Sequence, residues 1–190
     1  MDSKNPSGAK SRAEVYDWIQ CIIFALVFCV LLFVFAVRMV NVVGHSMVPT
    51  LEQSDKVVIS NLFYHPKQGD VVVLRKQTLM EEPIVKRIIA TEGQTVDIDF
   101  DDGVVYVDGK ALDEKYTLEP TYSRGNIEFP ATVPEGMLFV MGDNRNDSTD
   151  SRMRVVGFID EKYIMGKVIG RIMPFGQWDV YYNFHPDEGK

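Results

Sequence analysis

Residues 21–37 read CIIFALVFCVLLFVFAV, a run of seventeen apolar residues without a polar interruption. Extending the run back to Trp18 gives twenty residues, of which only Gln20 is polar. At about 1.5 Å per residue, a helix of that length spans roughly 30 Å, the thickness of the hydrocarbon core of a bilayer. The sequence therefore predicts one transmembrane helix close to the N-terminus.

The flanks of this run favour a retained anchor over a cleaved signal peptide. The apolar region of a signal peptide is about 7–15 residues long and ends at a small-x-small site. This run is longer and leads into Arg38, Met39 and Val40. The positive residues Lys4, Lys10 and Arg12 lie before it, so the positive-inside rule predicts a cytoplasmic N-terminus and an extracytoplasmic remainder.

Composition narrows the classes of function. The 190 residues include 27 acidic and 20 basic side chains, a formal net charge of −7. A chain this acidic offers no extended basic face, so nucleic acid is not an expected partner. Both cysteines, Cys21 and Cys29, lie inside the apolar run, and we expect no disulfide in the outer domain.

After Asn41 the sequence changes to short runs of β-forming residues separated by turn residues, which predicts a mostly β domain. The expected strands are Lys56–Ser60, Asp70–Arg75, Ile84–Ala90, Thr95–Phe100, Val104–Val107, Leu138–Met141, Lys167–Met173 and Trp178–Tyr182. The turn sequence Asp-Asp-Gly at 101–103 predicts a β-hairpin.

We expect three parts in the chain. Residues 1–14, rich in Ser, Lys, Gly and Asn, form a disordered cytoplasmic tail, residues 15–38 form the anchor, and residues 39–190 form the outer domain. Within the outer domain, residues 95–135 form a variable excursion or small subdomain, because residues 108–134 carry several Pro and Gly residues and little periodicity.

The first candidate for chemistry is the segment GHSMVPTL at residues 44–51. A serine becomes a nucleophile when a base accepts its proton, and Gly44 near Ser46 lets a substrate carbonyl approach the backbone closely. The segment is not the Gly-x-Ser-x-Gly elbow of hydrolases, because Val48 stands where that motif has Gly. The alternative is a plain linker turn at Pro49-Thr50.

The base could be a histidine or a lysine. His45 adjoins the serine but points to the opposite face if the segment is extended, whereas His65 and His185 lie near Pro in turn-like surroundings. A Ser-His-Asp triad stays open on these grounds. The lysine candidate is Lys86, which shares one face of a predicted strand with Ile84 and other apolar residues.

A buried Lys86 would be a better base than an exposed one. A free lysine has a pKa of about 10.4 and is neutral only about once in 2,500 molecules at pH 7. Apolar burial disfavours the ammonium form, and a pKa of about 8 requires roughly 3 kcal/mol of differential desolvation. The alternative is a half-exposed lysine whose amine reaches water.

The third candidate is the polar segment GDNRNDSTDSR at residues 142–152. A solvated loop is the usual role of such a run. In this one Asp143, Asp150 and Arg152 can pair with one another, and Ser148 offers a hydroxyl that could orient another group. It does not match a calcium-binding loop, because Arg154 occupies the position that requires Glu.

No metal or cofactor is expected elsewhere either, since the outer domain has no clustered His or Cys. Together, these segments behind a single N-terminal anchor resemble the type I signal peptidase family of membrane-bound serine proteases. The matching segments are GHSMVPTL at 44–51, GDVVV at 69–73, VKRII at 85–89 and GDNRNDSTDSR at 142–152. The lone anchor and compact domain are similar to the short form found in Gram-positive bacteria.

The resemblance implies a role for each matching residue. Ser46 would be the nucleophile, Lys86 the general base, and Ser148 a hydroxyl that orients Lys86. The implied structural shell consists of Arg87, Asp143, Asp150 and Arg152. Some family members bind the oxyanion with a serine two residues before the nucleophile, but this chain has Gly44 there, so backbone N–H groups, notably that of Ser46, must do more.

The resemblance also implies a two-lobed, mostly β catalytic domain on the outer membrane surface. Its activity would be removal of signal peptides from secreted preproteins after small-x-small sequences, through an acyl-enzyme, with preproteins and membrane lipids as partners and no cofactor. One alternative is a Ser/Lys peptidase with a dedicated substrate, such as a pilin-processing enzyme. The other is a non-catalytic, membrane-anchored binding module.

Overall fold

The structure is a computed structural model that describes residues 6–75 and 82–174. It consists of two units, Met1–Val37 and Arg38–Lys190. The first contains the helix α1 (Pro6–Ala36), and within it residues Glu14–Leu31 are apolar and long enough to cross a membrane. The helix starts inside the predicted tail, at Pro6 rather than residue 15. Proline suits a first helical position, and the following Ala, Lys, Arg and Glu residues are strong helix formers.

The second unit is built on a seven-stranded antiparallel sheet with the order β1-β2-β11-β3-β4-β9-β10. Its strands are β1 (Arg38–Asn41), β2 (Lys56–Ser60), β3 (Val71–Leu74), β4 (Ile84–Ala90), β9 (Met137–Met141), β10 (Ile159–Asp160) and β11 (Ile164–Met173), with a 3₁₀ turn at Glu161–Tyr163. Strand β4 pairs with β3 along one edge and with β9 along the other, and six of its seven residues are buried, on both faces of the strand.

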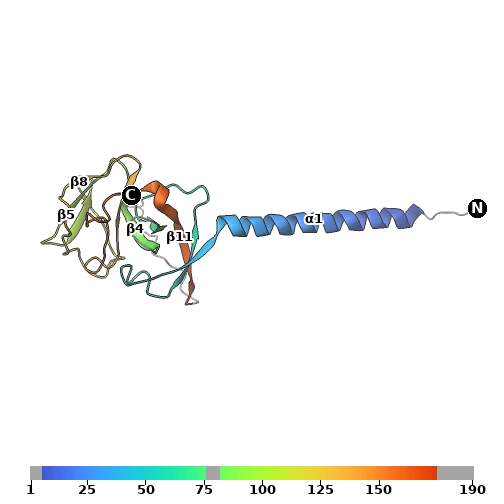
Figure 1. The fold of residues 1–190 in the computed structure, drawn as a ribbon, viewed down its shortest axis with the longest axis horizontal. Coiled ribbons are helices and arrows are strands. Elements are labelled where there is room, and N and C mark those ends of the chain that lie inside the picture. The colour runs from blue at the N-terminus through green and yellow to red at the C-terminus, as the bar shows by residue number, and fades with distance from the viewer. Residues whose placement is uncertain (1–5, 76–81, 175–190) are drawn as a thin grey trace, which may run out of the picture. The chain divides into compact units, whose positions relative to one another are not determined.

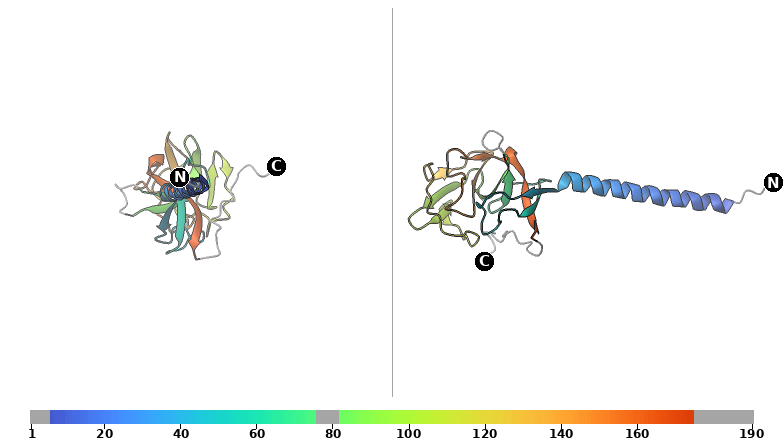
Figure 2. Two further views of the ribbon diagram at one scale, coloured as in Figure 1. Left: turned by 90° about the vertical axis from the view of Figure 1, so that its right-hand side faces the viewer. Right: turned by 60° about the horizontal axis from the view of Figure 1, so that its bottom comes forward.

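A second, four-stranded sheet has the order β7-β6-β5-β8. Its strands are β5 (Thr95–Asp99), β6 (Val104–Val107), β7 (Lys110–Ala111) and β8 (Ala131–Thr132). Strands β5 and β6 form the predicted hairpin, with Asp99 opposite Val104. Figures 1 and 2 show β5 and β8 grouped at one end of this unit, away from β4 and β11. The predicted mostly β, two-lobed fold class is confirmed.

The two sheets share an apolar core that holds β4 and β9 in place. Ile89 and Ala90 of β4 and Phe139 of β9 pack with Val96 and Val105 of the small sheet. Four rings continue this core in edge-to-face contacts, from Phe100 through Phe129 and Phe139 to Phe158. Burial of apolar area from both lobes therefore anchors β4 and β9. Strand β9 leads directly into the polar segment at residues 142–152.

Most of the predicted strands appear within one to three residues of their expected bounds, and Lys56–Ser60, Ile84–Ala90 and Val104–Val107 match them. The prediction for Trp178–Tyr182 lies outside the described residues. Four strands were not predicted: β1 directly after the helix, and β7, β8 and β10, which have two residues each. Two-residue strands carry no alternation in sequence, so only their pairing partners define them.

Candidate active site

Ser46 lies in a turn between β1 and β2. The turn is closed by a hydrogen bond from the Leu51 N–H to the Met47 carbonyl, 2.9 Å long. Met47 and Leu51 are completely buried in the apolar core beneath the turn, whereas Ser46 itself is partly exposed. Burial of Met47 and Leu51 thus fixes the turn and leaves the serine hydroxyl at the protein surface, where a substrate can reach it.

Lys86 lies forty residues further along the chain, on β4, and its Nζ is 2.5 Å from the Ser46 Oγ. The side chain is only 3% exposed. Burial lowers the pKa of Lys86 from 10.5 to about 8, although the negative charges of Asp150 and Asp143 oppose the shift. At pH 7 about one molecule in ten then carries a neutral amine, which can accept the serine proton.

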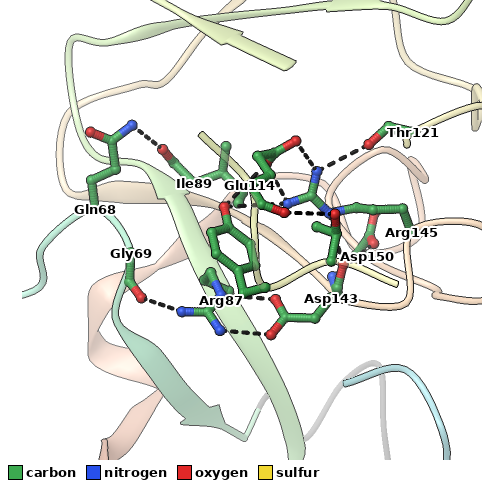
Figure 3. A network of polar contacts seen from close by, with 12 residues as sticks. Gln68, Gly69, Arg87, Ile89, Glu114, Thr121, Asp143, Arg145 and Asp150 are labelled. Carbon is green, nitrogen blue, oxygen red and sulfur yellow. Dashed lines mark hydrogen bonds and ion pairs between the residues drawn. The ribbon is translucent and has the colours of Figure 1, made fainter. Parts of the chain in front are cut away.

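Asp143 ties the turn of Ser46 to the strand of Lys86. Arg87, which follows Lys86, donates from Nε to Asp143 Oδ1 at 2.8 Å and from Nη2 to Oδ2 at 2.7 Å, and the whole pair is buried. Thr50, in the serine turn, donates from Oγ1 to Asp143 Oδ2 at 2.5 Å. Figure 3 shows the Arg87–Asp143 pair and the further bond from Arg87 to the Gly69 carbonyl. One carboxylate therefore fixes the spacing between the two reactive side chains.

Asp150 and Arg152 form a second buried ion pair. Arg152 Nε and Nη2 donate to the two oxygens of Asp150 at 2.8 Å each, and the Gly142 N–H donates to the same carboxylate at 3.1 Å. Burial alone would raise the pKa of Asp150, but the hydrogen bonds and charge of Arg152 hold this pKa below its usual value. The expectation that Asp143 joins this pair is wrong, because Asp143 binds Arg87.

Ser148 lies against Gly142, close to the nucleophile. A Cβ added at Gly142 would stand 2.4 Å from both the Ser148 Oγ and the Ser46 carbonyl oxygen, so only glycine fits there. The Ser148 Oγ is buried and makes no hydrogen bond to Lys86 in the described residues, while its hydroxyl helps to lower the pKa of the Asp150 carboxyl. The proposed orientation of Lys86 by Ser148 stays a prediction.

The backbone around Ser46 is open to a substrate oxygen. Gly44 has a φ of +87°, a conformation that favours glycine, and a Cβ there would meet nothing within 4 Å. In the described part of the chain the Ser46 N–H donates no backbone hydrogen bond. This N–H is thus available as an oxyanion donor.

The histidine alternative gains no support from the described residues. The His65 ring contacts the Phe63 carbonyl, and the His45 carbonyl accepts from Asn144, but neither imidazole bonds to Ser46. His185 lies outside the described residues. Among the residues that the structure describes, no three His, Cys, Asp or Glu side chains form a metal-binding group.

Sequence reasoning missed four residues of this site: Thr50, Glu114, Tyr116 and Arg145. Thr50 and Arg145 stood inside the quoted segments and had no role. Glu114 and Tyr116 lie in the 95–135 excursion, where neither periodicity nor a motif singled them out. The signal that could have found them is charge balance: Arg145 in a buried loop needs a carboxylate, and Asp143 and Asp150 already serve other arginines.

Comparison with known proteins places the chain in a family. Residues 15–173 match the family model "Signal peptidase, peptidase S26". The chain is 39% identical over 177 residues to a probable signal peptidase I-1 of Synechocystis, covering 87% of this chain and 86% of that protein. It is 32% identical over 197 residues to signal peptidase IB of Staphylococcus aureus strain MRSA252, covering 94% and 99%.

Among solved structures, a signal peptidase I from Enterococcus faecalis V583 is 29% identical, with a TM-score of 0.43 over 55% of this chain and 97% of that one. The family resemblance drawn from the four sequence segments is confirmed by the family model and by the relatives. The chain belongs to the signal peptidase family, peptidase S26.

Proposed function

We propose that this signal peptidase cuts secreted preproteins with Ser46 as the nucleophile and Lys86 as the general base. The observation that carries the proposal is the 2.5 Å contact between Lys86 Nζ and Ser46 Oγ, made by a lysine that is almost fully buried. A base must lie within hydrogen-bond reach of the proton that it removes, and its pKa must allow a neutral form near the working pH. Lys86 meets both conditions.

The reaction then proceeds in two halves. Neutral Lys86 takes the Ser46 proton while Oγ attacks the scissile carbonyl, and the Ser46 N–H donates to the developing oxyanion. The resulting ammonium protonates the leaving amine as the peptide bond breaks, which leaves an acyl ester on Ser46. Water, deprotonated by the again neutral Lys86, attacks this ester and releases the signal peptide with a free carboxylate.

The surrounding residues support the dyad without taking part in bond changes. Arg87 and Asp143 hold the two reactive segments together, and Asp150 with Arg152 fixes the loop that carries Gly142. Gly44 leaves the backbone open on the side of the oxyanion. We assign Ser148 the orientation of Lys86 once substrate fills the site, because its buried hydroxyl and the Ser46 carbonyl oxygen both lie against Gly142.

The helix and the family support a membrane-anchored enzyme. We propose that the N-terminus is cytoplasmic, because Lys4, Lys10 and Arg12 precede the apolar run, and that the catalytic domain meets its substrates at the outer lipid surface. The preferred cleavage sequence is small-x-small, as the family resemblance implies. The net charge of −7 supports the absence of a nucleic-acid partner.

The comparisons do not favour a pilin-processing enzyme or a non-catalytic module. The deciding experiment measures turnover of a purified preprotein by Ser46→Ala, Lys86→Ala and the double variant. We expect each to abolish cleavage while circular dichroism shows a folded domain, and the double to be no worse than either single, because nucleophile and base act as a unit. Turnover near that of the wild type in either single variant would end the assignment.

A further inference from the structure

We infer that Glu114 is a positioning residue for the nucleophile, acting from the 95–135 excursion through Arg145. The inference rests on the Ser46–Lys86 dyad proposed above. It concerns a segment that carries none of the four quoted sequence motifs. One continuous chain of contacts connects the Glu114 carboxylate to the Ser46 backbone.

The first link is a buried, bidentate ion pair. Arg145 Nη2 donates to Glu114 Oε1 at 2.5 Å, and Nη1 donates to Oε2 at 2.8 Å. The arginine side chain is fully buried and that of Glu114 is 12% exposed. A buried guanidinium without a partner is strongly unfavourable, so Glu114 determines where Arg145 can lie. Figure 3 shows the fork of Arg145 between Glu114 and Thr121, whose Oγ1 accepts from Nη1 at 3.0 Å.

The second link runs from Arg145 into the loop that touches the nucleophile. Arg145 Nε donates to the Gly142 carbonyl at 3.0 Å, which closes residues 142–145 into a tight turn. From this turn the Asn144 N–H donates to the Ser46 carbonyl at 3.0 Å, and the Asn144 side chain donates to the His45 carbonyl at 3.2 Å. The turn that Glu114 anchors is therefore bonded directly to the backbone of Ser46.

A third contact connects Glu114 to the lysine side of the site. The Tyr116 hydroxyl donates to Glu114 Oε1 at 3.1 Å, and its ring lies 3.9 Å from the Arg87 guanidinium carbon, within cation–π range. Arg87 follows Lys86 on β4 and binds Asp143. Burial and the charge of Glu114 raise the pKa of Tyr116, so its hydroxyl stays protonated and able to donate.

The rest of the excursion reinforces the same loop. Asn146 Oδ1 accepts from the N–H groups of Tyr122 and Ser123, and Arg152 Nη1 donates to the Ser123 carbonyl. These contacts hold residues 114–123 against residues 142–152 by directional hydrogen bonds. Such an arrangement specifies orientation, which is what an attacking hydroxyl requires, since a displacement of about 1 Å can reduce a rate about 100-fold.

The test uses Glu114→Gln in the full-length enzyme, assayed on a preprotein that carries a signal peptide. The matched control is Asp113→Asn, which removes the same charge one residue away, where the carboxylate forms an exposed pair with Lys115. Turnover is divided by the folded fraction from near-UV circular dichroism, so that loss of stability alone changes nothing. We expect kcat per folded molecule to fall about 10- to 100-fold in Glu114→Gln with KM within about twofold. Asp113→Asn should match the wild type.

A conservative variant adds a graded result. Glu114→Asp keeps the charge but withdraws the carboxylate by one methylene, so its kcat should lie between those of Glu114→Gln and the wild type. If Glu114→Gln does not fold, Glu114→Asp carries the test, because it keeps the negative charge that the buried Arg145 requires. A kcat per folded molecule at least threefold below that of the wild type then supports the inference.

The inference is overturned if the variant that carries the test keeps kcat per folded molecule within twofold of the wild type. It is also overturned if Asp113→Asn loses as much as Glu114→Gln. Ser46→Ala, assayed in parallel, separates this failure from failure of the dyad. An inactive Ser46→Ala beside a fully active Glu114→Gln rejects the positioning role alone, whereas an active Ser46→Ala rejects the dyad.

Discussion

Lys86 and Arg87 are adjacent on β4 and both are buried, but they lie on opposite faces of the strand and have different polar surroundings. Arg87 meets a bidentate carboxylate, two further acceptors and an aromatic ring. Lys86 meets a serine hydroxyl, and burial lowers its pKa to about 8. Arg87 is charged at any working pH and serves as structure with its carboxylate partner, whereas a buried lysine without a hydrogen-bonded carboxylate can lose its proton and act as a base. Two neighbouring residues of the same charge therefore acquire opposite roles.

The largest loss of activity should follow replacement of Lys86 by arginine, whose side chain is permanently charged. Lys86→Arg keeps a positive charge on a long side chain but cannot be deprotonated at any working pH. We expect kcat/KM for a preprotein to fall about 10²- to 10⁴-fold, the usual contribution of a general base. Steady-state kinetics from pH 7 to 10 measure it, and recovery of activity at high pH would contradict the role of a neutral amine.

Breaking the structural pair should damage the fold. Arg87→Met leaves Asp143 as a buried carboxylate without its ion-pair partner, and we expect the free energy of unfolding to fall by about 3–5 kcal/mol. The double variant Arg87→Met/Asp143→Leu removes both charges and should recover much of this loss. Urea unfolding of the three proteins gives the values. A double variant that is less stable than the single would show that the pair is not coupled.

Replacing Lys86 by an apolar residue should raise the free energy of unfolding instead of lowering it. The fall in the pKa of Lys86 from 10.5 to about 8 corresponds to about 3 kcal/mol of unfavourable burial. This penalty is fully present below pH 8 and disappears as the pH rises to 10.5, because the unfolded chain then also loses its proton. Lys86→Met should therefore stabilise the protein by up to about 3 kcal/mol at pH 7 and by progressively less towards pH 10. A lower free energy of unfolding for Lys86→Met than for the wild type at pH 7 would contradict the unfavourable burial of the Lys86 ammonium.

The smallest expected effect is a shift in a pH profile. The carboxylate of Asp150 raises the pKa of Lys86 and the guanidinium of Arg152 lowers it. Asp150→Asn removes the first influence and leaves the second, so the ascending limb of kcat/KM should move to lower pH. Asp113→Asn, at an exposed site, should leave the limb in place. Movement of the limb to higher pH in Asp150→Asn would refute this electrostatic account.

The sequence was sufficient to predict the parts of the site that lie on regular elements. The apolar run predicted the helix, and the period of two in Ile84–Ala90 predicted the strand that buries Lys86. The family resemblance supplied Ser46 as the partner of Lys86, since no local pattern relates residues forty positions apart. The pKa of about 8 required of a useful base agrees with the burial found at this position.

The polar network could not be predicted in the same way. Within residues 142–152 three aspartates and two arginines are spaced without periodicity, so the sequence does not say that Asp143 binds Arg87 while Asp150 binds Arg152. Glu114 pairs with Arg145, which lies 31 residues further along the chain, beyond β8 and β9. Such pairings depend on loop paths, which are determined by the packing of both sheets rather than by local propensity.

The pH dependence of kcat/KM in the wild-type enzyme tests the central claim most directly, because it reports the pKa of the free enzyme's base. With a soluble peptide that carries a cleavage site, we expect activity to rise along a limb with a midpoint at about pH 8, the pKa that burial gives Lys86. A midpoint near 10.5, the ordinary value for lysine, would show that Lys86 is not desolvated in the working enzyme. A midpoint near 6.5 would instead identify a histidine as the base and contradict the Ser46–Lys86 dyad.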